Sequence, residues 1–299
     1  MNTNKEKSIQ IPLLGGLGNQ IFQFSAGIYL QQKYGREVHY PAALLRPPKF
    51  LIARKTTIRN LMISELINSD KQKNMSKLQI LALQMCTSSK NRYVVTENES
   101  NAELLDKWDS KTRVFIGYFQ QLKYVDAVRV ELLERFGSSA TFKTLIPKSL
   151  EPRIAIHIRL GDYSSNQHAR TFHGLSDISY FVEGAKILLQ RLQIRNLLIV
   201  SDEPKRALSL FEQYFDQNDI QITCSSGLNE YEDLALLSHS KGLVASNSSF
   251  SWWAAWLSSP LGSQVIVPSP WFAELSKAEE NLFDSRWTIL ERRILISDQ

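Results

Sequence analysis

Arg159 and the serine-rich stretch 246–250 are the residues of this 299-residue chain best suited to binding an anion. An arginine offers a fixed fork of N–H donors that matches phosphate oxygens. The stretch reads Ser-Asn-Ser-Ser-Phe and lies between a short apolar run and a helix-like segment. Its backbone N–H groups would therefore lie at the start of a helix, where they have no helical partner. Helix starts carry partial positive charge and suit phosphate. We therefore predict that Arg159, with Ser248 and Ser249, holds a diphosphate and stabilises the charge that develops as it leaves.

Two residues near Arg159 admit more than one interpretation. Asp162 suits a general base, a carboxylate that orients a ligand, or a turn residue after Gly161, and spacing alone favours the turn. His157 shares a face of the expected strand with Arg159, because side chains along a strand alternate with a period of two. It either contacts a ligand or lies hydrogen-bonded in the core, and the core is the default expectation.

A glycine-rich loop, Gly15–Gly18, joins the first apolar run to a segment with helical spacing. It lacks the third glycine of the dinucleotide fingerprint, since residue 21 is Ile, and it lacks Gly-Lys-Ser/Thr. A phosphate loop and a tight turn without a ligand are therefore about equally supported. Farther along, Trp252, Trp253 and Trp256 favour core packing over a stacking platform for a sugar.

Composition and missing motifs disfavour several classes of protein. The chain is 43% hydrophobic and 22% charged, as in globular proteins, and its net charge of +5 gives no reason to expect a nucleic-acid partner. No Asp-x-Asp, Gly-x-Ser-x-Gly or His/Cys cluster occurs, which disfavours a bound metal, esterases, proteases and zinc enzymes. Cys86 and Cys224 lie far apart, so we expect a reduced, cytoplasmic protein.

Membrane contact, if any, is expected to be peripheral. No stretch approaches the ~20 apolar residues that span a bilayer, and the polar start precedes too short an apolar run for a signal peptide. The segment 33–59 is basic and contains one acid, Glu37. A solvated face is the favoured interpretation, with docking on an anionic membrane as the alternative. The basic residues are Lys33, Arg36, Arg46, Lys49, Arg54, Lys55 and Arg59.

These residues are positioned by a chain that alternates strand-like and helix-like segments. In the second half, we expect strands at 153–159, 197–200, 220–223, 243–245 and 264–267, with helices at 178–192, 204–215 and 230–240. Such alternation predicts a doubly wound parallel sheet, whose ligands lie beyond the carboxyl ends of its strands. Three polar clusters fall at such ends, namely 159–162, 201–202 and 246–249.

The first half is less regular. Strands are expected at 9–14, 37–40, 93–96 and 114–118, and helical patterns at 21–34, 51–84 and 124–136. Gly137–Ala140, followed by Pro147 and Pro152, is the best linker candidate. We therefore predict two domains, 1–148 and 149–299.

Four motifs together resemble the α-1,2-fucosyltransferases that use GDP-fucose, including bacterial enzymes of surface-polysaccharide assembly. Residues 15–23 resemble the opening motif and 117–124 a mid-chain element. Residues 157–163 are similar to the His-x-Arg-Arg-x-Asp motif of fucosyltransferases, and 246–253 resemble the most specific signature. The matches run in the expected order over most of the chain.

The resemblance implies an α/β fold of the GT-B type, with two Rossmann-like domains that face each other across a cleft. The first domain would lie on the acceptor side and the second would bind GDP-fucose. The implied reaction is an inverting, metal-independent transfer of L-fucose to the 2-hydroxyl of a terminal β-galactoside, without a cofactor. The implied setting is O-antigen or other surface-glycan synthesis in the cytoplasm, with a lipid-linked, galactose-terminated oligosaccharide as acceptor.

The resemblance also implies roles for individual residues. Arg159 would bind the donor β-phosphate and act in catalysis, while Ser249 and the backbone of Phe250 would hold the diphosphate from the other side. Similarity to the core α-1,6-fucosyltransferases implies that His157 and Asp233 contact guanine. Asp162 is the candidate base. The other expected donor-binding residues are Gly16, Gly18, Asn19, Gln20, Asp202, Asn247 and Ser248.

One departure from the family pattern leaves alternatives open. The second arginine of the motif is Leu160 here. Because residues 159 and 160 point to opposite faces of the strand, we take Arg159 as the phosphate ligand. A binding protein without catalysis, or a transferase for another nucleotide sugar, are the alternative functions.

Overall fold

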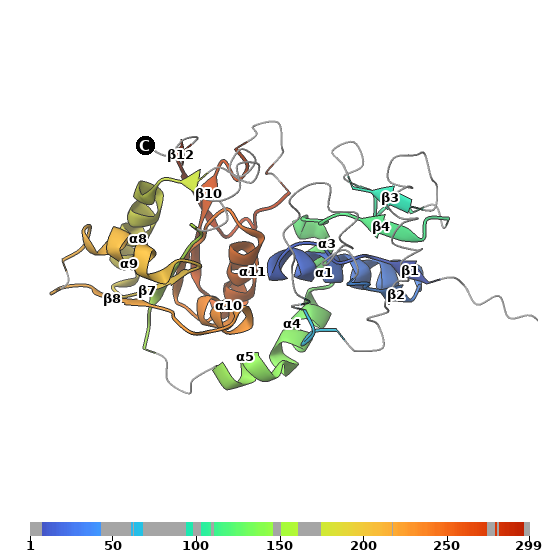
Figure 1. Cartoon of the computed structure of the whole chain (residues 1–299), viewed down its shortest axis with the longest axis horizontal. Coiled ribbons are helices and arrows are strands. Elements are labelled where there is room, and N and C mark those ends of the chain that lie inside the picture. The colour runs from blue at the N-terminus through green and yellow to red at the C-terminus, as the bar shows by residue number, and fades with distance from the viewer. Residues whose placement is uncertain are drawn as a thin grey trace, which may run out of the picture. The chain divides into compact units, whose positions relative to one another are not determined.

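The computed structural model describes residues 8–42, 61, 63–67, 94–97, 103–108, 111–145, 151–160, 175–216, 218–273, 279 and 281–295. By its internal contacts the chain divides into two compact units, Met1–Ser139 and Ala140–Gln299 (Figure 1). Helix α5 (Ala140–Leu145) belongs to the second unit, where the ring of Phe142 lies 6.5 Å from that of His239. The sequence places the division later, at 148/149, in a stretch outside the described residues.

The second unit is built on a parallel sheet whose strand order reverses in the middle. Its strands are β5 (Ile154–Ile158), β7 (Asn196–Ser201), β8 (Gln221–Cys224), β9 (Gly242–Val244), β10 (Gln264–Ser269) and β11 (Thr288–Glu291). The order is β11-β10-β9-β5-β7-β8, and each neighbouring pair is parallel. From β5 the chain winds outward through β7 and β8, and then returns to β9 on the other side of β5. This is the order of doubly wound nucleotide-binding sheets, which bind ligands where the winding reverses.

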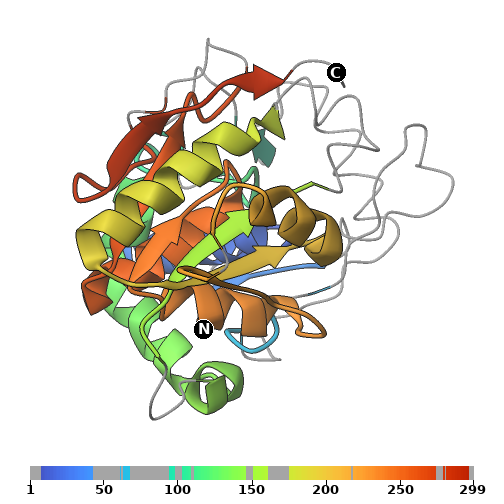
Figure 2. The same ribbon diagram turned by 90° about the vertical axis from the view of Figure 1, so that its left-hand side faces the viewer.

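Two helices cover each face of this sheet (Figures 1 and 2). Helices α8 (Ile178–Leu192) and α9 (Pro204–Glu212) lie on one face, and α10 (Glu230–Ser238) and α11 (Ser249–Ser258) lie on the other. The starts of three of these helices are set by residues next to them in the sequence. Asp177 caps α8, Pro204 opens α9, and Asn229 and Glu232 form a capping box on α10. The predicted doubly wound sheet is therefore confirmed.

Strand β5 is buried because apolar side chains pack on both faces of the sheet. Ile154, Ile156 and Ile158 are buried on one side of the sheet against α8 and α9. On the other side the rings of Trp252, Trp253 and Trp256 are fully buried in edge-to-face contacts. The Trp252 indole N–H donates to the carbonyl of Leu282 at 2.6 Å. The prediction that these tryptophans pack the core is confirmed, and α11 is firmly anchored.

The first unit has a smaller parallel sheet with the order β2-β1-β4-β3. Its strands are β1 (Ile9–Gln10), β2 (Val38–His39), β3 (Val94–Thr96) and β4 (Val114–Ile116). Helix α1 (Leu17–Tyr34) follows β1 and ends at Gly35, whose φ of 64° is the left-handed conformation that glycine adopts freely. The winding again reverses between neighbouring strands, here β1 and β4.

The structure corrects three expectations about secondary structure. The single helix expected at 124–136 is two helices, α3 (Leu122–Ala127) and α4 (Arg129–Ser138), because Val128 leaves the helical region with φ −116° and ψ 19°. Strand β11 was not predicted, since its exposed and half-buried residues alternate without a long apolar run. The short antiparallel pair β6 (Leu175–Ser176) and β12 (Ile294–Leu295) was also missed. Most of the helix expected at 51–84 lies outside the described residues.

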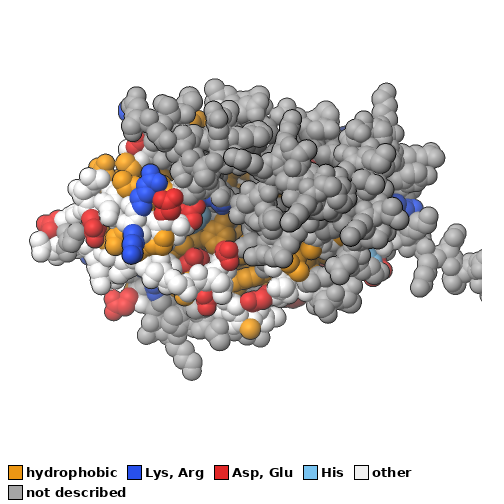
Figure 3. Space-filling view, viewed as in Figure 1, with side chains coloured by type: hydrophobic (Ala, Val, Ile, Leu, Met, Phe, Trp, Pro, Cys, Tyr) orange, Lys and Arg blue, Asp and Glu red, His pale blue; other side chains and the backbone are white. Residues whose placement is uncertain are grey.

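The surface carries charges of both signs. On the described part of the second unit in Figure 3, acidic and basic side chains are interspersed. In the first unit, Lys33 pairs with Asp106 at 2.8 Å and the Arg36 guanidinium lies over the Trp108 ring at 5.7 Å. The other members of the basic segment, from Arg46 to Arg59, lie outside the described residues. Within the described part of the chain, the helices are too short or too polar to cross a membrane.

Candidate anion site of the second unit

The candidate site lies at the carboxyl ends of β5 and β9, where the winding of the larger sheet reverses. These strands are neighbours, with Ile156 paired to Val244. Arg159 follows β5 by one residue, and the segment 245–248 follows β9 and leads into α11. The topology therefore brings together the two segments that the sequence singled out.

The start of α11 offers unpaired backbone donors. Ser248 is the N-cap residue, and its hydroxyl accepts from the Ser251 N–H at 3.2 Å. The Trp252 N–H closes the first helical turn on the Ser248 carbonyl at 3.0 Å. Among the described residues nothing accepts from the N–H of Ser249 or Phe250. Both residues are partly exposed, so two amides and the Ser249 hydroxyl are available to an anion at a positively polarised helix end.

His157 is buried beside these donors. The residue is 7% exposed, and its ring lies 5.1 Å from that of Phe250. Burial, with a further contribution from the charge of Arg159, lowers the pKa of His157 to about 3. The ring is therefore neutral at physiological pH. Its Nδ1 contacts the hydroxyls of Ser246 and Ser251, so the default expectation of a hydrogen-bonded core histidine describes this side of the ring.

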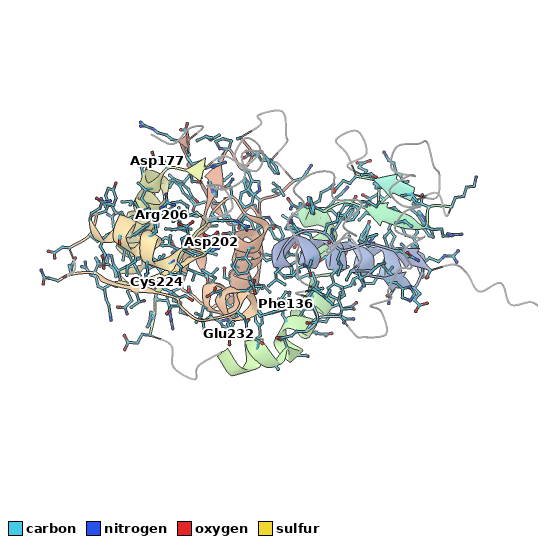
Figure 4. The ribbon with its side chains drawn as sticks, in the orientation of Figure 1. Phe136, Asp177, Asp202, Arg206, Cys224 and Glu232 are labelled. Atoms are coloured by element: carbon cyan, nitrogen blue, oxygen red, sulfur yellow. The ribbon has the colours of Figure 1, made fainter. Side chains whose placement is uncertain are left out.

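Asp202 ties the segment beyond Arg159 to the neighbouring strand. The backbone N–H of Leu160 donates to Asp202 Oδ1 at 2.8 Å, and Asp202 lies just beyond the end of β7 (Figure 4). The Leu160 side chain packs against the apolar core, whereas Arg159 is partly exposed. A leucine at position 160 thus has a packing role, and the structure assigns Asp202 a role in holding the Arg159 segment.

Asp233 lies in the first turn of α10, which begins after the carboxyl end of β8. The Ser225 hydroxyl donates to its Oδ1 at 2.5 Å. Burial, with smaller contributions from Glu230 and Glu232, raises the pKa of the Asp233 carboxyl, although the bond from Ser225 opposes the shift. A carboxylate at this edge of the sheet remains a candidate acceptor for a base that carries N–H donors.

Two other predicted residues have different outcomes. Asn247 is buried, and its side-chain amide donates to the Trp271 carbonyl at 3.2 Å, so it secures the loop after β10. Asp162 lies outside the described residues, so its assignment as the base stays a prediction. Within the described ranges, no group of three or more His, Cys, Asp or Glu side chains could hold a metal ion.

In the first unit the glycine-rich loop is held by glutamine side chains. Gly15 has a φ of 73°, and its carbonyl accepts from the Gln20 amide at 3.0 Å. Gln23 is buried and bridges the Leu14 N–H at 2.9 Å and the Gly117 carbonyl at 2.8 Å. The buried Gln20 therefore stabilises the loop, while Gly16 and Gly18 lie at the start of α1.

The opening motif and the mid-chain motif meet at the point where the smaller sheet reverses its winding. The Gln120 amide donates to Asn19 Oδ1 at 2.8 Å. The Glu97 carboxylate accepts from the N–H groups of Tyr118 and Phe119, each at 2.8 Å, and Phe119 has a φ of 52°. Sequence reasoning missed Gln23, Glu97 and Gln120 as structural partners. Gln23 lies within the opening motif and in helical spacing with Asn19, but neither signal indicates which backbone groups it contacts.

Replacing Gly117 with alanine is expected to destabilise the first unit. A Cβ there would lie 2.5 Å from Glu97 Cβ and 3.0 Å from the Phe119 ring, so the turn must shift. Overpacking of this kind costs about 1–3 kcal/mol, measurable by urea unfolding. In the matched control, Gly137→Ala in α4, the new Cβ meets no atom within 4 Å, and stability should rise by about 0.5–1 kcal/mol. Equal stability of the Gly117 variant and the unmodified chain would contradict the geometry.

The fold is that of an α/β protein with a doubly wound sheet, and the candidate anion site lies at the switch point of this sheet. The family model described as Glycosyl transferase family 11 matches residues 1–291. The chain therefore belongs to Glycosyl transferase family 11, which confirms the resemblance drawn from the four motifs.

Individual proteins are also similar to this chain. The chain is 27% identical over 306 residues to an α-1,2-colitosyltransferase of Escherichia coli, covering 94% of this chain and 98% of that protein. It is 25% identical over 308 residues to the O-antigen biosynthesis glycosyltransferase WbnK of Escherichia coli, covering 89% and 96%. Among solved structures, fucosyltransferase NodZ from Bradyrhizobium matches with a TM-score of 0.48 and 9% identity, covering 84% of this chain and 93% of NodZ.

Proposed function

We propose that this family 11 glycosyltransferase transfers L-fucose from GDP-β-L-fucose to the 2-hydroxyl of a terminal β-galactoside, with inversion and without a metal. The observation that supports the proposal is that Arg159 follows β5, while the unpaired amides of Ser249 and Phe250 lie beyond the end of the neighbouring strand β9. The name of one Escherichia coli relative, the O-antigen biosynthesis glycosyltransferase WbnK, supports a role in O-antigen synthesis.

In the proposed reaction the acceptor oxygen attacks the anomeric carbon from the face opposite the nucleotide. The bond between that carbon and the β-phosphate oxygen breaks, and negative charge develops on departing GDP. Arg159 and the first amides of α11 stabilise this charge, which is the electrostatic role such donors serve best in a site shielded from water. Asp162 is our candidate acceptor of the hydroxyl proton. His157 and Asp233 are proposed to face the guanine.

A second donor is favoured by one relative. The first of the two Escherichia coli proteins is named for colitose, a sugar related to fucose by loss of the 3-hydroxyl. The phosphate and base sites would serve GDP-colitose equally, because they lie on the nucleotide side of the broken bond. The choice between the two sugars thus depends on contacts to the sugar ring.

The test is a combined binding and turnover experiment on the full chain. Calorimetry should find binding of GDP and none of UDP at the same concentration. With a panel of Galβ1,3 and Galβ1,4 acceptors, GDP-fucose should give a product whose linkage NMR identifies as α-1,2, at the same rate in excess EDTA. Slow hydrolysis of GDP-fucose without acceptor should distinguish an enzyme from a pure binder. Turnover with GDP-colitose alone would overturn the donor assignment, and a strict Mn²⁺ requirement would overturn metal independence.

A further inference from the structure

His157 is one corner of a buried triangle of hydrogen-bonding atoms. Its Nδ1 lies 3.0 Å from the Ser246 hydroxyl oxygen and also contacts the Ser251 hydroxyl. The two hydroxyl oxygens are 2.9 Å apart, and the Ser251 oxygen accepts from the Ser246 backbone N–H at 3.1 Å. Ser246 is 2% exposed and Ser251 is fully buried, so bulk water has little access to these bonds. The hydrogens of the triangle must therefore satisfy one another.

Counting those hydrogens distinguishes the two neutral tautomers of the ring. If Nδ1 is unprotonated, Ser251 donates to Nδ1 and Ser246 donates to the Ser251 oxygen. That oxygen then accepts from the Ser246 hydroxyl and the Ser246 N–H, so both of its lone pairs are used. If Nδ1 carries the proton, three hydrogens share two acceptor oxygens, and one hydroxyl has no acceptor among the described residues. A buried unsatisfied donor costs about 1–3 kcal/mol, so the first tautomer is favoured.

The proton of the favoured tautomer is on Nε2, the other ring nitrogen. Within the described part of the chain, Nε2 makes no hydrogen bond, and it is not among the fully enclosed unpartnered atoms. The ring that carries it lies 5.1 Å from the ring of Phe250, the second residue of α11. Nε2 is thus an N–H donor available to a ligand.

We propose that Ser246 and Ser251 are positioning residues that hold His157 in the Nε2–H tautomer, so that the site selects a ligand atom that accepts a hydrogen bond. The part of this proposal that concerns the ligand rests on the proposed function. An N–H donor at Nε2 would suit two parts of a guanosine diphosphate. These are the O6/N7 edge of guanine, which carries only acceptors, and a phosphate oxygen. The adenine edge offers an N–H₂ donor at the position of O6, so an adenine nucleotide is disfavoured at the base edge.

The test of the tautomer is ¹⁵N NMR of the ligand-free chain, with the His157 signals assigned by their loss in His157→Gln. Nδ1 should have a pyridine-type shift and Nε2 a pyrrole-type shift, unchanged between pH 5 and 8. The reverse assignment in the unmodified protein would overturn the proposal without any variant. In the double variant Ser246→Ala/Ser251→Ala, we expect a mixture of tautomers. The matched control is Ser258→Ala, in the same helix, whose buried hydroxyl donates to the Ala255 carbonyl; it should leave the His157 shifts unchanged.

Binding measurements test the consequence for ligands. The double variant should bind GDP about tenfold more weakly, which corresponds to one hydrogen bond of ordinary strength, and Ser258→Ala should not. An analogue of GDP without O6 separates the two sources. If His157 donates to the base, loss of O6 weakens binding to the unmodified chain and not to His157→Ala; if it donates to phosphate, both chains respond equally. Unchanged GDP affinity in the double variant would overturn the positioning role. If the unmodified chain has the Nε2–H tautomer but binds no GDP, the proposed function is wrong. The role of Ser246 and Ser251 in fixing the tautomer would still be supported.

Discussion

Replacing Arg159 with alanine is expected to lower kcat by on the order of 10²-fold or more, because removal of one preorganised donor to a developing anion has this effect. Arg159 is partly exposed just beyond the end of β5, so the variant should keep the thermal midpoint of the unmodified chain. Initial rates of GDP release in the presence of acceptor measure the effect. Arg159→Lys should recover only part of the rate, since an ammonium cannot reproduce the two-pronged geometry of a guanidinium.

The same strand supplies the control for this prediction. Arg153 immediately precedes β5 and so lies at the amino end of the strand, opposite the end that carries Arg159. Its carbonyl accepts from the Lys241 N–H at 3.0 Å. Arg153→Ala removes an equal charge from the protein and should leave kcat within about twofold, since its distance from the site exceeds the range of unscreened interaction. If Arg153→Ala and Arg159→Ala lower kcat equally, the effect is one of net charge and the phosphate assignment is wrong.

Replacing Ser249 with proline is expected to have the second large effect, and the structure permits this substitution without loss of the helix. Ser249 is the first residue of α11, where proline is favoured because its missing N–H has no helical partner. The preceding residue, Ser248, has φ −128° and ψ 145°, the extended conformation that a following proline requires. The variant therefore deletes one candidate anion-binding amide together with the hydroxyl. We expect on the order of a 10²-fold loss in kcat, with weaker GDP binding by calorimetry.

Two further variants separate the effect of losing the Ser249 amide from the effect of losing its hydroxyl and from the effect of a proline at a helix start. Ser249→Ala removes the hydroxyl alone and should lose about tenfold, the worth of one hydrogen bond to a charged group. Glu230→Pro places a proline at the first position of α10, after the extended Asn229, and should leave thermal stability unchanged. Equal activity of Ser249→Ala and Ser249→Pro would mean that the amide makes no contact with the leaving group.

Much of the second unit could be predicted from the sequence because local and tertiary signals agree there. The helix from Ile178 to Leu192 has the predicted bounds, since Asp177 caps its start and apolar residues recur along the face that packs on the sheet. The polar residues beyond β5 and β9 were recognisable because strand ends in a doubly wound sheet converge. The strand order that makes β5 and β9 neighbours was not predictable, since it depends on pairings between segments distant in the sequence.

The site was predictable in residue type and less so in role. Asn247 and Gln20 are residue types that often contact ligands. In the structure, however, their side-chain amides donate to the backbone carbonyls of Trp271 and Gly15. No pattern in the sequence distinguishes an amide that binds backbone from one that binds substrate. Likewise, the serines at 246 and 251 read as a polar turn and a helix position, and only their approach to His157 gives them a function.

The fully buried tryptophans of α11 have a consequence for how charge is accommodated during turnover. Three buried indole rings along α11 oppose any rotation or sliding of this helix. Under the proposed function, its amides would be oriented before a nucleotide binds, so that binding would cost little conformational entropy there. Under the same proposal, α11 would therefore keep its position while the leaving group departs.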